Sequence, residues 1–215
     1  MYMYIIKGGI LMFEKINYCE ITVQKILKIS GNNIHLIFDK NSENIYTKSI
    51  IELNADEEII NIKSDEDDNN KVKIHVGSKN KMQEISISAD KLKIEGDIFS
   101  EIININSNGL ISNAYIRSKI YNFKGNGLYL NNVLNSDKIS LDSNGIKTSV
   151  EIENNQLFDI DANGVAGKIK FRDNLPTKMN LNCMGGLISL YMSEKKVFDI
   201  NQPTKGTLVK KILIQ

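Results

Sequence analysis

The sequence predicts an all-β protein, with a small N-terminal β domain followed by a β-repeat array of about 18 residues per unit. A short phrase centred on Asn-Gly returns four times, at 106–110, 124–128, 142–146 and 161–165, so its glycines recur at a near-constant interval. An alternating apolar run precedes each phrase. The composition, with 35 Ile and 27 Asn against 2 Pro and no Trp, favours pleated strands joined by polar corners.

Residues 1–13 are expected to be a leader that lies outside the fold. Lys7, Gly8 and Gly9 can be encoded by a purine-rich sequence of the kind that binds bacterial ribosomes, which makes Met12 the expected start of the native protein. No small-residue cleavage site follows the apolar opening, so a signal peptide is not favoured.

Residues 14–80 are expected to form the N-terminal β domain, which would dock the protein to a partner. Residues 20–39 predict a hairpin with its turn at Gly31, because glycine and the asparagines after it accept left-handed backbone angles. A helix over 16–27 is the alternative, but the β-branched content favours a strand. Short strands are expected at 45–53, 58–63 and 72–76. The acidic run at 64–71 predicts a solvated hairpin tip, with a calcium loop as the alternative.

Residues 81–172 are expected to form the repeat shaft, and residues 173–215 further repeats or a cap. Each unit should contain a tight turn, two short strands and a polar corner. The predicted turn residues are the Asn-Gly pairs Asn108, Gly109, Asn126, Gly127, Asn144, Gly145, Asn163 and Gly164.

A single unit of this kind cannot bury its apolar face alone, so units must stack on one another or on other chains. Two architectures satisfy this requirement: an intertwined trimeric β-fibre and a single-chain β-solenoid. The apolar residues keep only a rough six-residue spacing, which favours the trimer.

No catalytic, cofactor or metal site is predicted. Asp159, Asp161, Asn163 and Gly164 match the opening of an EF-hand loop, but Lys170 stands where that loop needs a glutamate.

The cysteines and histidines do not suggest a site either. Cys19 and Cys183 are isolated thiols, and His35 and His75 have no ligand partner at metal-site spacing.

Two further patterns bear on chemistry or binding. Glu151 and Glu153 share a strand face as a glycosidase pair could, although exposed charge is favoured. Four tyrosines are candidates for surface contacts with a sugar, since a ring stacks on a sugar while its hydroxyl forms a hydrogen bond, although a role as filler between units is favoured. The candidates are Tyr115, Tyr121, Tyr129 and Tyr191.

Charge and hydropathy exclude two classes of partner. The formal net charge is +1 and the lysines are interleaved with acids, so no nucleic-acid-binding stripe is expected. The sequence has no apolar stretch of the roughly 18 residues that a membrane span requires, so no membrane partner is expected.

Three units resemble tail-fibre and baseplate proteins of bacteriophages and phage-tail-like particles from low-GC Gram-positive hosts. They are SADKLKIEGDI at 88–98, IININSNGLISNAYI at 102–116 and LFDIDANGVAGKI at 157–169. The resemblance covers about residues 82–172 and carries no catalytic residues. It implies a docking domain ahead of a slender β-repeat, a homotrimer, contacts with other tail or baseplate proteins, and a place in the virion tail after assembly in the host cytoplasm.

The function expected from these observations is that of a virion structural protein. It would dock on the phage tail or baseplate and contact the host surface, for instance a cell-wall glycan. A fibre-borne glycan depolymerase and a bacterial polymerising β-solenoid or adhesin are the alternatives.

Overall fold

The computed structural model describes residues 14–16, 19–64, 71–172, 175–193, 199–201 and 206–214. Over these residues the protein is all-β, with one 14-stranded mixed sheet. The strands are β1 Glu14–Ile16, β2 Cys19–Thr22, β3 Ile26–Asp39, β4 Asn44–Thr47, β5 Ile51–Ala55, β6 Ile59–Lys63, β7 Val72–Gly77, β8 Met82–Leu130, β9 Val133–Asn154, β10 Leu157–Phe171, β11 Lys178–Cys183, β12 Gly186–Ser193, β13 Asp199–Asn201 and β14 Thr207–Ile214.

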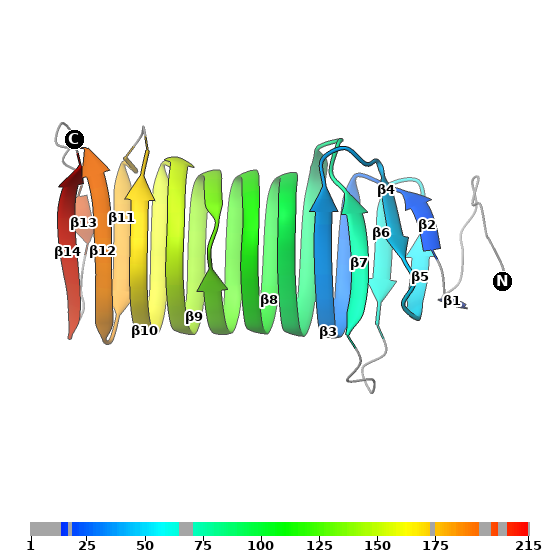
Figure 1. Ribbon diagram of the computed structural model, residues 1–215, viewed down its shortest axis with the longest axis horizontal. Helices are drawn as coiled ribbons and strands as arrows, with labels where there is room; N and C mark the ends of the chain where they lie inside the picture. Colours follow the sequence, from blue (N-terminus) through cyan, green and yellow to red (C-terminus); the bar gives the residue numbers. More distant parts are fainter. Residues whose placement is uncertain are drawn as a thin grey trace.

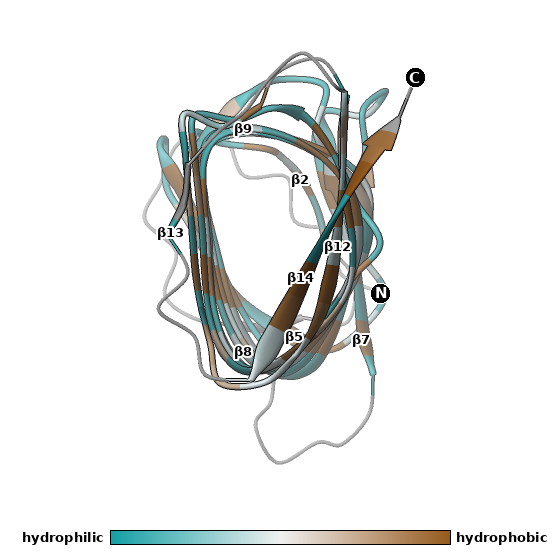
Figure 2. Cartoon of the chain, turned by 90° about the vertical axis from the view of Figure 1, so that its left-hand side faces the viewer, coloured by the Kyte–Doolittle hydropathy of each residue, from teal (hydrophilic) through white to brown (hydrophobic). Residues whose placement is uncertain are grey.

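Most of the chain winds into successive coils that lie side by side along the long axis (Figure 1). Seen along that axis, the coils superpose into one elongated ring (Figure 2). Neighbouring coils pair in parallel, with Tyr115 beside Val133, Lys138 beside Leu157 and Leu157 beside Lys178. The number of residues between paired positions therefore increases slightly toward the C-terminus, because the coils become longer. This is the single-chain β-solenoid arrangement.

The described residues therefore do not form the intertwined core that the rough apolar spacing favoured. Each coil pairs with another coil of the same chain, which buries the apolar face without strands from other chains. The spacing is irregular because coil length changes and because two successive residues, such as Asn108 and Gly109, both lie outside the core at a corner. Assembly of whole rods into a homotrimer stays a prediction.

The core consists of apolar columns that run through the coils. In each coil an inward residue stands against its counterpart in the next coil, as Phe123 does against Leu141 and Leu141 against Ile160. Each fully buried side chain of this size stabilises the fold by about 1.5–3 kcal/mol. One column contains Ile62, Ile29, Ile87, Ile105, Phe123, Leu141, Ile160 and Leu181, all buried.

The hairpin predicted for residues 20–39 is wrong. β3 is one strand from Ile26 to Asp39, and both of its halves pair in parallel with β8, from Glu84 to Gly96. Gly31 bends this strand instead of reversing it. Its φ is +153°, and an added Cβ would lie 1.6 Å from Ser64 Oγ, so a glycine is required there for space.

The hairpin tip predicted for residues 64–71 is also not formed by its flanking strands. β6 and β7 do not pair with each other; both pair in parallel with β3, at Ile26–Ser30 and Ile34–Asp39 respectively. The acidic residues 65–68 themselves lie outside the described residues.

The N-terminal strands and the coils belong to one sheet. The spatial order runs β5, β6, β3, β8, so β3 lies between strands that follow it in the chain. The expected domain boundary between residues 80 and 81 therefore falls inside a continuous sheet. Beyond β6 and β7 the pairing becomes antiparallel, because β5 runs against β6 and β4 runs against β7.

Candidate binding surface

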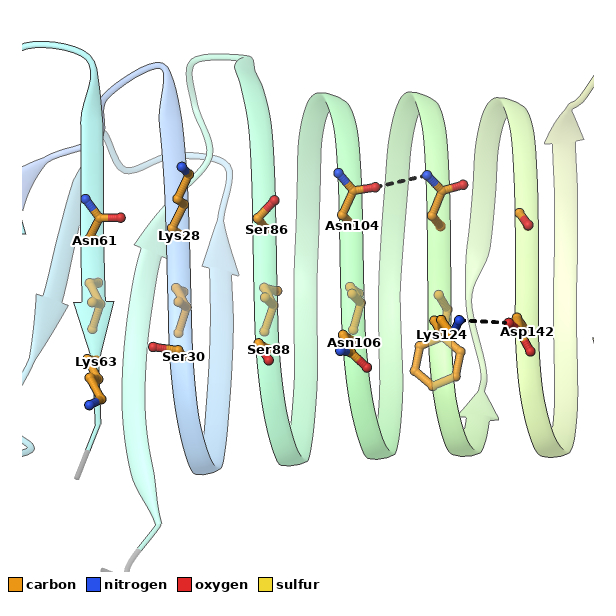
Figure 3. A pocket seen from close by; sticks show the side chains of 17 residues that line it. Lys28, Ser30, Asn61, Lys63, Ser86, Ser88, Asn104, Asn106, Lys124 and Asp142 are labelled. Atoms are coloured by element: carbon orange, nitrogen blue, oxygen red, sulfur yellow. Dashed lines mark hydrogen bonds and ion pairs between the residues drawn. The ribbon is translucent and has the colours of Figure 1, made fainter. Parts of the chain in front are cut away.

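Two rows of polar side chains, the polar rows, run along one long face of the solenoid. They arise because each coil contributes a tripeptide whose middle residue points into the core and whose outer residues point to solvent, as in Asn104-Ile105-Asn106. The first row contains Asn61, Lys28, Ser86, Asn104, Asn122 and Ser140, and the second contains Lys63, Ser30, Ser88, Asn106, Lys124 and Asp142 (Figure 3).

A shallow, open depression of about 690 Å³ runs along the polar rows and the apolar residues between them. Within the rows, Asn122 Nδ2 donates a hydrogen bond of 2.9 Å to Asn104 Oδ1, and Lys124 Nζ lies 3.9 Å from Asp142 Oδ2 (Figure 3). Successive strands of a sheet are about 4.8 Å apart, so the rows present amide, hydroxyl and charged groups at that step. A long polymer lying along the axis would meet a polar group at every coil.

A continuous hydrogen-bonded ladder of asparagines, the asparagine ladder, marks the adjacent corner. Asn108 donates to Asp90, Asn126 to Asn108, Asn144 to Asn126 and Asn163 to Asn144, each bond 2.7 Å long. The four asparagines are those of the repeated Asn-Gly phrase. The amides of Asn108, Asn126 and Asn144 both donate and accept along the axis, and that of Asn163 donates at the end of the ladder, so the bonds hold one coil on the next.

The Asn-Gly pairs do lie at a corner, but not in the left-handed conformation expected of a tight turn. Among the described residues, positive φ occurs only at glycines outside these pairs, namely Gly31, Gly96, Gly167, Gly186 and Gly206. Gly127 pairs with Gly145, and Gly145 pairs with Gly164, within parallel strands. The chain therefore bends gently through each pair while remaining in the sheet.

Beside the ladder lies a furrow, the glycine furrow, floored by Gly109, Gly127, Gly145, Gly164 and Gly185. Its volume is about 1050 Å³. A Cβ added at Gly145, Gly164 or Gly185 would meet nothing within 4 Å, so these glycines leave space on the surface rather than avoiding a clash. The wall two residues further along each strand holds Ile111, Tyr129 and Lys147, with 53% of Ile111 and 41% of Tyr129 exposed.

The structure does not gather the four predicted contact tyrosines. Tyr129 is exposed, and Lys147 Nζ lies 5.5 Å from the centre of its ring. Tyr115 is half-buried: its hydroxyl donates a 3.0 Å hydrogen bond to Glu153, and its ring meets Phe99 edge to face at 6.2 Å. Burial, and then the bond to Glu153, raises the pKa of Tyr115. Tyr191 is half-buried in β12.

Tyr121 cannot be a surface contact, because it is fully buried. It stands beside Ile139, which stands beside Phe158, so it fills a position in an apolar core column. Its hydroxyl has no hydrogen-bond partner, and burial raises its pKa far above the ordinary value.

Replacing Tyr121 with phenylalanine is therefore expected to preserve or raise the free energy of unfolding, by up to about 2 kcal/mol, because an unpaired buried hydroxyl is removed. Tyr115→Phe should do the opposite, lowering it by about 1 kcal/mol through loss of the bond to Glu153. Urea denaturation of both variants measures the difference. A clear loss of stability in Tyr121→Phe would contradict the unpaired hydroxyl.

Glu151 and Glu153 form an ion cluster rather than a pair of free carboxylates. Arg172 contacts both, with Nε 2.8 Å from Glu151 and Nη1 2.6 Å from Glu153, and Lys170 Nζ lies 2.8 Å from Glu151. Hydrogen bonds from Arg172 and then Lys170 lower the pKa of Glu151 to about 2. A carboxyl with this pKa stays ionised at neutral pH, so it does not suit the general-acid role of a glycosidase.

Acid should weaken this cluster, because a carboxyl with a depressed pKa contributes stability above its unfolded pKa of 4.5 and loses it as pH falls through about 2. We expect the thermal midpoint of the wild type to fall across this window, and to fall less in Glu151→Gln. Circular dichroism melting curves measure it. Glu57→Gln, at an exposed turn before β6, is the control and should follow the wild type; equal slopes for all three would refute the assignment.

The candidate metal-binding residues are engaged in other contacts. Asp159 and Asp161 accept hydrogen bonds from Asn180 and Asn182 in the next coil. His35 Nε2 lies 2.6 Å from Glu95 Oε2, and burial is the main cause that lowers the pKa of this histidine. Within the described residues, no group of three or more His, Cys, Asp or Glu side chains is arranged to hold a metal ion.

The polar rows, the bonded ladder and the furrow were not predicted from the sequence. A signal for the rows was present, since polar–apolar–polar tripeptides recur as SIS at 86–88, NIN at 104–106, NFK at 122–124 and SLD at 140–142. Such tripeptides resemble any half-exposed strand, so only their alignment between coils distinguishes them.

Comparisons with known proteins complete this description. No family model matches the chain, and no curated protein matches it. The described residues contain no helix long and apolar enough to cross a membrane. The chain is similar to a solved structure from Bacteroides fragilis described as a "putative adhesin", with 18% identity, 93% of this chain and 97% of the other covered, and a TM-score of 0.44.

Proposed function

We propose that this protein is a structural attachment protein, a rod that binds an extended glycan along its side. Two properties support the proposal. The coils stack in register over much of the chain, which makes a stiff support. The polar rows then present amide and hydroxyl groups at a constant step, suited to a ligand that is itself repetitive and rich in hydroxyls.

The polar rows are the observation on which the proposal depends. A flat array repeating at about 4.8 Å has little to offer a compact small molecule, which would contact two or three coils at most. A linear glycan has sugar units of similar length and donates and accepts hydrogen bonds along its whole course. Many weak contacts would then add up through multivalency.

The biological setting that we propose is the tail or baseplate of a bacteriophage, as the resemblance in the repeats suggests. There the rod would be a homotrimeric virion component whose N-terminal part docks on other tail proteins and whose coils contact the host wall. Light scattering of the purified protein tests the assembly, and a trimer is expected. A monomer at micromolar concentration would contradict the homotrimer. End-to-end filaments would favour a polymerising solenoid or adhesin.

A co-sedimentation assay with insoluble glycans, including peptidoglycan sacculi, cellulose and chitin, tests the binding function. Arginines at Asn104 and Asn122 should block the polar rows and reduce binding to the glycan that the wild type retains. The control places arginines at Asn113 and Asn131, which form the same kind of stacked amide pair, with a 3.3 Å hydrogen bond, outside the polar rows.

Three outcomes of that assay decide the matter. Loss of binding in the first variant alone supports the proposal. Equal loss in both variants, or no binding of the wild type to any of these glycans, would overturn it. Release of soluble sugar by the wild type would instead favour the glycan depolymerase.

A further inference from the structure

The glycine furrow differs from the polar rows in the chemistry of the residues that line it. Its long wall begins with Lys93, continues through Ile111 and Tyr129, and reaches Lys147, each in the coil after the one before. Lys91, close to Lys93, also lines the furrow and occupies the coil position at which later coils have the floor glycines. The described residues that line the furrow include lysines and no carboxylate.

The positive charges lie near the two ends of this stretch. Lys93 and Lys147 are separated by three coil steps, or about 14 Å at about 4.8 Å per step. Lys93 Nζ also contacts Glu95 at 2.8 Å, whereas Lys147 Nζ lies 5.5 Å from the ring centre of Tyr129. The centre of the wall is apolar and aromatic, because Ile111 and Tyr129 are both exposed there.

We propose that the glycine furrow binds a linear acidic glycan, a chain of pyranose sugars that carry carboxylates. The lysines would pair with carboxylates about three coils apart, and the ring of Tyr129 would stack on the apolar face of the sugar between them. The missing side chains at Gly109, Gly127 and Gly145 provide the width for a sugar chain beside the asparagine ladder. This inference deepens the proposed function and rests on it, by naming a class of glycan.

The test uses galacturonate oligomers and their methyl esters, which have the same sugar chain without the charge. The purified full-length protein should bind the acid at least roughly tenfold more tightly than the ester by isothermal titration calorimetry, the difference expected for one charge-assisted contact. Lys147→Glu should weaken binding of the acid by a similar factor. Raised salt should weaken binding of the acid and leave the ester unaffected.

Two control variants separate the furrow from general effects of charge. Lys48→Glu makes the same charge change at another lysine over a tyrosine, since Lys48 Nζ lies 6.0 Å from the ring centre of Tyr46 outside the furrow. It should bind the acid as the wild type does. Gly145→Leu, at a position with open space, should fill the furrow and abolish binding while retaining the wild-type melting curve.

The remaining outcomes count against the inference. Equal affinity for acid and ester, equal effects of Lys147→Glu and Lys48→Glu, or unchanged binding in Gly145→Leu would each overturn it. Inorganic polyphosphate as tight as the galacturonate would show a general polyanion site and overturn the choice of a glycan. A protein that sediments with a neutral glycan but does not bind the acid loses only this inference, whereas one that binds neither loses the proposed function too.

Discussion

Replacing Gly125 with alanine should lower the free energy of unfolding by about 3 kcal/mol, while alanine at Gly127 should change it by less than about 0.5 kcal/mol. The two glycines are close neighbours in the phrase KGNGL. A Cβ at Gly125 would lie 1.7 Å from the carbonyl oxygen of Ser107 in the preceding coil, a contact with backbone that no rotamer change relieves. At Gly127 the nearest atom would be 3.6 Å away, which is ordinary van der Waals contact.

Chemical denaturation of the two single variants measures this difference directly. For a protein of this size, a loss of about 3 kcal/mol should lower the thermal midpoint by about 6–12 °C. Neither residue has a positive φ, so the conformational preference of glycine does not confuse the comparison. If the two alanine variants proved equally stable, the close approach of the coils at Gly125 would be wrong.

Truncating Phe123 to alanine should cost about 3–5 kcal/mol, the range for a large aromatic residue removed from a close-packed core. Phe123 is 2% exposed and stands beside Leu141 in the column that lies beneath the polar rows. The cavity would therefore open in the middle of the solenoid, where neighbouring coils are held in register on both sides. The variant should also weaken glycan binding, because the polar rows would lose their support.

Phe99→Ala provides the comparison, since Phe99 is only half-buried and its ring meets Tyr115 at the surface. Its cost should be about 1 kcal/mol, consistent with the loss of one aromatic pair and partial burial. Hydrogen exchange would locate the damage, with faster exchange expected in the coils next to Phe123. Equal destabilisation by the two truncations would contradict the placement of Phe123 in the core.

Much of the coil geometry could be predicted from the sequence because stacked coils repeat their own pattern. The interval between successive Asn-Gly phrases is the same interval that separates paired strands, as between Gly127 and Gly145. The all-β class follows from the alternation of apolar and polar residues and from the many isoleucines. The sequence could not tell which chain closes the core, because an apolar stripe is buried equally well by its own coils and by other chains.

The fold predicted for the N-terminal part was wrong for a related reason. A glycine between two apolar runs can reverse a chain or bend it, and Gly31 does the second, because both flanking runs find partners in β8. The position of β3 between β6 and β8 requires pairing between segments far apart in the chain, such as Ile26 with Glu84. Local turn chemistry contains no information about such pairing.

Individual residues of the candidate site could be predicted from the sequence, but their arrangement could not. Tyr121 and Tyr129 look alike in sequence, yet the corner at Asn126-Gly127 shifts the alternation, so the first points into the core and the second to solvent. The asparagines were identified as corner residues without their bonds, since a ladder needs the neighbouring coil. Surface rows of this kind become visible only when coils are aligned in three dimensions.

The parallel stacking of the coils also has a mechanical consequence. Hydrogen bonds between coils point along the rod, so a pull between its ends would load them in tension and separate one coil at a time. An opened coil of about 18 residues can extend to about 60 Å while the chain stays covalently continuous. A rod built in this way can lengthen under load and remain attached at both ends.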